Sequence, residues 1–105
     1  MDSKLFAFVL LTISAAGLHS AAASDVSVII KNFDYSPMDL NIAPGTTVVW
    51  KNLDGEPHTI ASTDGMFRSP ALDQNDSYSF TFNRLGVFKY ICSIHPKMRA
   101  TITVK

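Results

Sequence analysis

The feature that most constrains this chain is a series of short β-forming runs bounded by turn residues. In the clearest run, Tyr78, Phe80 and Phe82 alternate with Ser79 and Thr81, which is the period of two of a strand with one apolar face. The other runs are 26–30, 40–42, 46–50, 58–61, 86–91 and 99–105. No sustained helical period follows the amino-terminal segment. We therefore expect an all-β, antiparallel-rich sandwich of about seven to eight strands.

The first 23 residues have the order of a secretory signal peptide. Lys4 precedes the apolar run Leu5 to Leu18, and the small residues Ala21 to Ala23 follow, which predicts cleavage after Ala23. The alternative is a membrane anchor, but this run is shorter than the roughly 20 residues that a spanning helix needs. We expect an exported protein, periplasmic in a bacterial host, without a membrane anchor after cleavage.

The remaining residues, 24–105, have room for one small domain. They carry eight acidic and eight basic residues without a long run of one sign, which argues against nucleic acid or an anionic membrane as a partner. Their single cysteine, Cys92, cannot form an internal disulfide. A bound metal is therefore a natural candidate for stabilising so small a core.

Cys92, His95 and Met98 follow one another at intervals of three residues, after an alternating run and before the last one. Taken singly, the cysteine or the methionine is more often a core residue. Together they offer a thiolate, an imidazole and a thioether, and a blue-copper site needs one further histidine. Because His19 leaves with the signal peptide, His58 is the candidate. Strand ends from distant parts of a sequence meet at one pole of a sandwich, so His58 can reach the loop.

Three segments, 42–52, 57–60 and 86–99, resemble the cupredoxins, the small blue-copper proteins, and most of all the amicyanin branch. The short C-x-x-H-x-x-M spacing is the specific part, because plastocyanins and azurins have longer ligand loops. The resemblance implies a Greek-key β-sandwich that holds one type 1 copper ion. It also implies that His58, Cys92 and His95 form the trigonal plane and that Met98 is the long axial ligand.

The resemblance further implies a monomeric electron carrier between redox partner proteins, not an enzyme, with an amine dehydrogenase as a possible class of donor. The alternative is a protein for copper storage or delivery, although such proteins favour exposed sites rich in methionine or cysteine. Copper enzymes of related fold need further histidines, and none remain beyond His58 and His95. Covalent haem needs a C-x-x-C-H motif, which the sequence lacks, and thioether ligation argues against zinc.

Two departures from the amicyanin pattern concern the hydrogen bonds of the site. Thr59 stands where asparagine usually follows the first ligand, and its hydroxyl could link the two ligand loops more weakly. Ile94 stands where proline usually precedes the second histidine, and it restores a backbone N–H that we expect near the Cys92 sulfur. Because hydrogen bonds to a bound thiolate tune the potential, Ile94→Pro is predicted to lower it. Ala100 replaces a common glycine without an evident consequence.

The family pattern also implies that His95 is the electron port. Its ring edge would reach the surface in an apolar patch made by Pro57, Ile94 and Pro96. Lys97 and Arg99 are either simply solvated or steer an acidic partner. A weak patch on a chain without net charge predicts a small, transient encounter surface.

Overall fold

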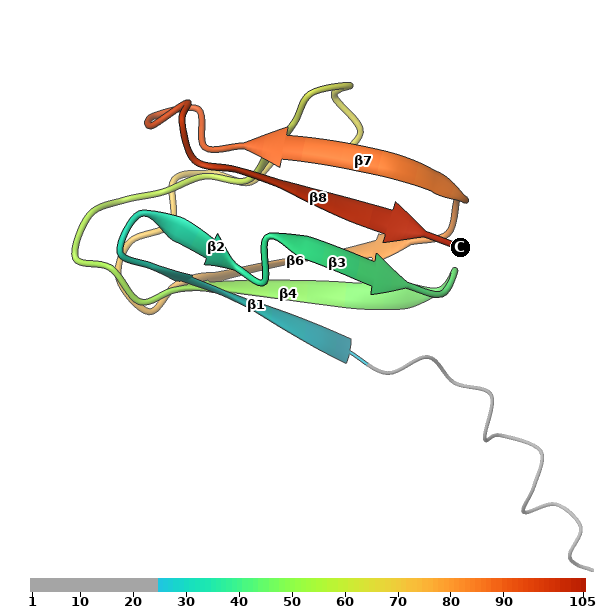
Figure 1. Cartoon of the computed structure of the whole chain (residues 1–105). Helices are drawn as coiled ribbons and strands as arrows, with labels where there is room; N and C mark the ends of the chain where they lie inside the picture. The colour runs from blue at the N-terminus through green and yellow to red at the C-terminus, as the bar shows by residue number, and fades with distance from the viewer. Residues whose placement is uncertain (1–24) are drawn as a thin grey trace, which may run out of the picture.

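The computed structural model describes residues 25–105, so the predicted signal peptide lies outside the described residues. Eight strands form two four-stranded sheets (Figure 1). The order in the first sheet is β2 (Asp34–Ser36), β1 (Asp25–Lys31), β4 (Thr46–Asn52) and β6 (Ser77–Phe82). The order in the second is β3 (Asp39–Ile42), β8 (Arg99–Val104), β7 (Gly86–Ile91) and β5 (Ala61–Ser62). Within this part of the chain, no helix is long and apolar enough to cross a membrane.

The strand pairing confirms the all-β sandwich and adds detail that the sequence pattern did not supply. Antiparallel pairs join β1 to β2, β4 to β6, β5 to β7 and β7 to β8. β1 and β4 run parallel, however, and so do β3 and β8, which makes both sheets mixed. Alternation identifies the buried face of a strand but not its neighbour, so these parallel pairs were not predicted. The short strand β2 was missed as well.

The core lies between the sheets and contains the predicted apolar faces. Trp50, Phe67, Phe82 and Phe88 are each at most 4% exposed, as expected for core residues. The Trp50 Nε1–H donates to the Tyr90 hydroxyl at 3.0 Å, which connects β4 of one sheet to β7 of the other. This bond satisfies two polar groups that would otherwise be buried without partners.

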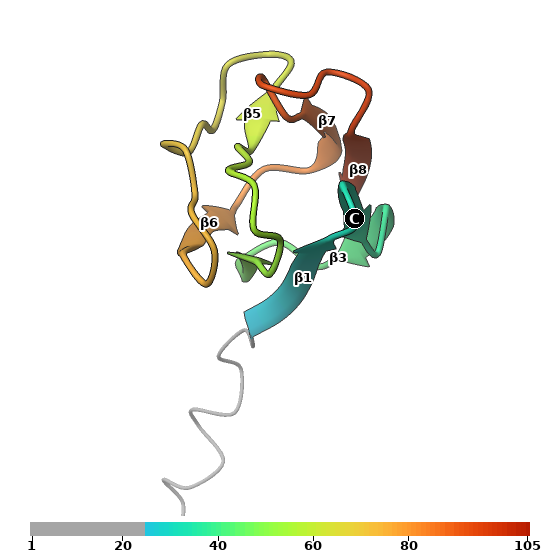
Figure 2. The same cartoon turned by 90° about the vertical axis from the view of Figure 1, so that its left-hand side faces the viewer.

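One end of the sandwich collects the turns that concern function. The β1–β2 turn, the segment after β4 and the β7–β8 loop lie at the left in Figure 1, and Figure 2 views this end face-on. Hydrogen bonds confirm the proximity: Asp54, after β4, accepts from Asn32 in the β1–β2 turn, and Thr59 accepts from Ser93 in the β7–β8 loop. The predicted ligands therefore lie on two neighbouring segments of one pole.

Candidate metal centre

The β7–β8 loop is a tight curl whose two ends are joined by backbone hydrogen bonds. The N–H of Cys92 donates to the carbonyl of Met98 at 3.1 Å, and the N–H of Met98 donates to the carbonyl of His95 at 2.9 Å. Cys92 and Met98 are buried, whereas Ile94 is 47% exposed. The spacing of three residues thus sends the two sulfur-bearing residues inward and leaves the middle of the loop at the surface.

His58 follows a turn that is anchored by the buried side chain of Asn52. The amide nitrogen of Asn52 donates to the carbonyls of Glu56 and Leu72 at 2.9 and 2.8 Å, and its oxygen accepts the N–H of Asp54 at 2.9 Å. His58 itself pairs with Leu72 in an isolated β-bridge, so it precedes β5 rather than beginning a strand as expected. These contacts fix the backbone from which the fully buried imidazole projects.

The His58 ring has its two nitrogens in different surroundings. Nε2 lies 2.9 Å from Oδ2 of Asp54, and Nδ1 lies 3.9 Å from the Cys92 sulfur. Burial raises the pKa of the Asp54 carboxyl, but hydrogen bonds from Phe33, Asn32 and His58 outweigh this effect and lower it. The carboxylate is therefore an acceptor, Nε2 carries the proton, and the lone pair of Nδ1 faces the thiol, which is the arrangement of carboxylate-supported metal ligands.

Thr59 links the two ligand segments directly. Its hydroxyl accepts the N–H of Ser93 at 2.8 Å and lies 2.9 Å from the Ser93 hydroxyl. Its backbone N–H donates to the Cys92 sulfur at 3.3 Å, and its hydroxyl lies 3.8 Å from the same sulfur. The predicted link is present, and it consists of two hydrogen bonds to Ser93.

The expected hydrogen bond from Ile94 to the Cys92 sulfur is wrong. Among the described residues, the donors to this sulfur are the N–H and the hydroxyl of Thr59, and the N–H of Ile94 is not one of them. The physical reason is the curl of the loop, in which Ile94 lies at the exposed turn and Thr59 reaches the sulfur from the neighbouring segment. The suggestion that Ile94 tunes the sulfur therefore loses its basis.

His95 is half-buried, and its ring is held by aromatic contacts. Its centroid lies 5.1 Å from that of His58 and 4.9 Å from that of Phe33. Its Nε2 is buried without a hydrogen-bond partner among residues 25–105. Such an atom costs about 1–3 kcal/mol when left unpaired, so a ligand for this ring is chemically favoured.

A hollow of about 480 Å³ opens beside His95. It is lined by Phe33, Asp34, Ile94, His95, Pro96, Lys97 and Met98. Ile94 and Pro96 were expected here, whereas Phe33 was not and Pro57 does not line the hollow. Asn32-Phe33 directly after a strand run was the only sequence signal for this turn, and Asp54 four residues before His58 was the signal for the supporting carboxylate.

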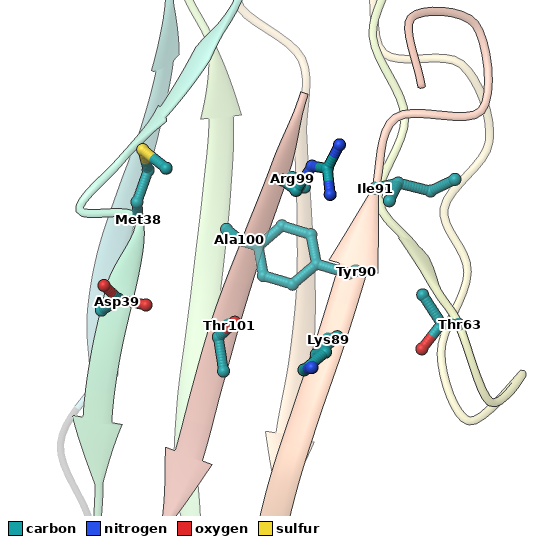
Figure 3. A pocket seen from close by; sticks show the side chains of 9 residues that line it. All are labelled: Met38, Asp39, Thr63, Lys89, Tyr90, Ile91, Arg99, Ala100 and Thr101. Atoms are coloured by element: carbon teal, nitrogen blue, oxygen red, sulfur yellow. The ribbon is translucent and has the colours of Figure 1, made fainter. Parts of the chain in front are cut away.

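A second groove, of about 300 Å³, lies on the outer face of β3, β8 and β7 (Figure 3). Lys89 and Arg99 border it together with Asp39, so its charge is mixed. Lys97 lines the hollow beside His95 instead. None of the four predicted ligands lines this groove, and Lys97 and Arg99 face different hollows instead of forming one basic surface.

The residues fit a copper ion in donor type and in the spacing that the structure shows. A sulfur and a nitrogen bound to one ion at about 2.3 and 2.0 Å stand roughly 3.5–3.7 Å apart at tetrahedral to trigonal angles, close to the 3.9 Å between the Cys92 sulfur and Nδ1 of His58. Across the described residues, no three histidine, cysteine or acidic side chains are grouped tightly enough to enclose a metal by themselves. The buried Met98 adds a thioether as a further candidate donor at this site.

Comparisons with known proteins agree with this geometry. A cupredoxin-like domain model matches residues 4–104. Amicyanin of Paracoccus versutus is 33% identical over 88 residues, which cover 79% of this chain and 67% of that protein. Plastocyanin of Scenedesmus fuscus is 33% identical over 84 residues, which cover 68% of this chain and 86% of that protein.

Solved structures give the same result. A purple cupredoxin from Nitrosopumilus maritimus matches with a TM-score of 0.71 and 40% identity, covering 77% of this chain and all of that one. The Cu(I) form of an amicyanin mutant matches with a TM-score of 0.74 and 28% identity, covering 77% of this chain and 82% of that one. The domain model covers the segment that carries the site, the relatives and solved structures agree with it, and the chain belongs to the cupredoxin family.

Proposed function

We propose that this chain is an exported carrier of single electrons that holds one copper ion through His58, Cys92, His95 and Met98. The observation that carries the proposal is the buried Cys92 sulfur. It lies 3.9 Å from a ring nitrogen of His58 and receives the N–H of Thr59 at 3.3 Å. A thiolate supported in this way beside an imidazole is the core of a type 1 site.

A bound copper ion would supply a centre that takes up and releases one electron. The residues keep that centre rigid, because hydrogen bonds of Asn52, Asp54 and Thr59 fix the backbone and the ring around it. Rigid ligands favour electron transfer, since little has to move when the oxidation state changes. The half-buried His95 beside an apolar hollow offers the short path to a partner.

The relatives support a carrier over an enzyme. The matched proteins include amicyanins and a plastocyanin, which are electron carriers. A copper nitrite reductase from Thermus scotoductus also matches, but this chain covers only 22% of it. The donor and acceptor are redox proteins, and an amine dehydrogenase is the class of donor that the amicyanin resemblance suggests.

The alternative function is copper storage or delivery, and one experiment separates the two. Apoprotein starting at Ser24 is mixed with Cu(II), and absorption and voltammetry are recorded. A carrier gives an intense blue or purple colour and a reversible one-electron wave. Colourless binding of Cu(I), with ready transfer to a chelator, would instead support delivery.

Two ligand variants and one control variant test the ligand assignment. Cys92→Ser should abolish the colour, because the charge-transfer absorption requires the thiolate. Met98→Leu should change the spectrum and the potential, whereas Met38→Leu should change neither, since Met38 is 51% exposed and lines the other groove. Equal effects of the two methionine variants would remove Met98 from the set.

Export is tested separately. We propose that residues 1–23 are removed, and mass spectrometry of protein recovered from the periplasm of a bacterial host should show Ser24 as the first residue. Recovery of the full-length chain from the cytoplasm would contradict this part without affecting the copper site. Analytical ultracentrifugation of the processed protein tests the expectation of a monomer.

A further inference from the structure

Phe33 occupies an unusual place between the two histidines. Its ring meets the ring of His58 edge-on at 5.0 Å and 85°, and that of His95 at 4.9 Å and 75°. It is nevertheless 44% exposed, so it is not an ordinary core residue. Part of this residue is thus open to solvent, while its ring contacts include both of the imidazoles that the proposed copper site uses.

The backbone that carries this ring is strained. Asn32 and Phe33 form the two-residue connection between β1 and β2, with φ of 54° and 60°. A hairpin turn with two positive φ values favours Asn-Gly, because glycine, which has no side chain, adopts a positive φ at the second position without steric cost. A phenylalanine at the second position is an outlier of the kind that persists where the surroundings compensate for it.

The compensation comes from the carboxylate that also holds His58. Oδ1 of Asp54 accepts the N–H of Asn32 at 2.7 Å, and Oδ2 accepts the N–H of Phe33 at 2.9 Å. The same Oδ2 lies 2.9 Å from Nε2 of His58. The Asp54 side chain thus holds both the strained turn and the His58 imidazole, and this fixes the position of the Phe33 backbone relative to His58.

His95 has no comparable support of its own. Its Nε2 has no hydrogen-bond partner among the described residues, and it lies in a surface loop. The ring contacts found for it are those with Phe33 and His58. The His95 ring therefore packs against two rings, that of His58, which Asp54 anchors, and that of Phe33.

We propose that Phe33 is a positioning residue that wedges His95 against His58, so that this ligand stays at copper in both oxidation states. The proposal rests on the copper-carrier function above. It explains why a strained, exposed aromatic residue stands where glycine would be easier for the backbone. Phe33 does not donate to the metal and acts only through the histidine rings.

The test compares Phe33→Gly with Asn32→Gly. Phe33→Gly removes the ring while relieving the positive φ, so the turn should still form, and thermal unfolding of the apoprotein verifies this. Asn32→Gly makes the same kind of change one residue earlier and keeps the ring. In the Phe33→Gly apoprotein, the NMR order parameter of the His95 ring should fall below about 0.6, the range of flexible groups, and it should stay high in Asn32→Gly.

Copper-loaded protein provides the second readout. X-ray absorption of the Cu(I) form should show one histidine nitrogen fewer in Phe33→Gly than in wild type or Asn32→Gly. If the order parameter of the His95 ring and the number of Cu(I) ligands are the same in both variants, Phe33 does not position His95 and the inference is wrong. If wild type itself binds no copper with a charge-transfer colour, the proposed function fails instead, and the apoprotein measurement still decides whether Phe33 orders the ring.

Discussion

The hydroxyl of Thr59 is the part of the site whose removal has the most definite consequence. Thr59→Val keeps the shape of the side chain and the backbone N–H that donates to the Cys92 sulfur at 3.3 Å. It removes the group that accepts the Ser93 N–H at 2.8 Å and lies 2.9 Å from the Ser93 hydroxyl. The same hydroxyl lies 3.8 Å from the Cys92 sulfur, so this contact is lost as well.

The expected loss of stability follows from the two bonds to Ser93. A hydrogen bond contributes about 0.5–1.5 kcal/mol net, and a buried donor left unpaired costs about 1–3 kcal/mol. Ser93 is exposed at its side chain while its N–H is covered by Thr59, so we expect a loss of about 1–3 kcal/mol. For a domain of this size, 1 kcal/mol lowers Tm by roughly 4–8 °C.

The expected change in potential follows from the single proton of the hydroxyl. Ser93 can donate to Thr59, which leaves that proton free to point at the sulfur 3.8 Å away. At this long distance we assign about 0.5–1 kcal/mol of difference between the oxidation states. Because a tenfold change in a one-electron equilibrium corresponds to about 59 mV, the potential should fall by roughly 20–40 mV. The sign is negative because a sulfur with fewer donors stabilises Cu(II).

The assay combines voltammetry of the copper protein with thermal unfolding of the apoprotein, for wild type, Thr59→Val and Thr59→Ser. The serine variant retains the hydroxyl and should have nearly the wild-type potential. A potential that is unchanged or higher in Thr59→Val, together with the expected loss of stability, would show that the hydroxyl links the loops without acting on the sulfur. If Thr59→Val is as stable as wild type, the reasoning from the hydrogen bonds of the Thr59 hydroxyl is refuted for both the stability and the potential.

Three further outcomes are expected. Ile94→Pro should leave the reduction potential within about 10 mV of wild type, because the sulfur of Cys92 receives its hydrogen bonds from Thr59 and not from the N–H of Ile94. A clear fall of the potential in voltammetry would restore the expectation from the sequence. Saturation with copper at about 100 times its Kd should stabilise the fold by about 2.7 kcal/mol, measured by chemical denaturation with and without the metal. Burial raises the pKa of Tyr35 far above the ordinary value of 10.0. The protonated Tyr35 hydroxyl therefore makes its full contribution to the stability of the fold below pH 10, and this contribution is lost as the pH rises further. Tyr35→Phe should reduce that alkaline loss in denaturation curves, and a slope equal to wild type would contradict it.

Sequence reasoning was most successful where the signal is local. Alternation along 78–82 and 86–91 identified the buried faces of β6 and β7, because the side chains of a strand point to opposite sides in turn. The spacing of Cys92, His95 and Met98 indicated a compact loop, and the structure shows that loop closed by hydrogen bonds between its own residues. The placement of His58 beside Cys92 followed from the geometry of a sandwich, in which distant strand ends share a pole.

The tertiary structure decided the contacts between segments far apart in the sequence. The parallel pairing of β1 with β4, the choice of Thr59 over Ile94 as donor to the sulfur, and the position of Phe33 between two histidines have no local pattern. Asp54 meets Asn32 across 22 residues, and an acidic residue in a turn gives no sign of such a partner. The sequence by itself was enough to propose the copper ligands and to locate most of the strands, because periodicity and spacing are properties of the chain. Only the folded packing could determine how those ligands are oriented, because orientation depends on neighbours that the chain brings together by folding.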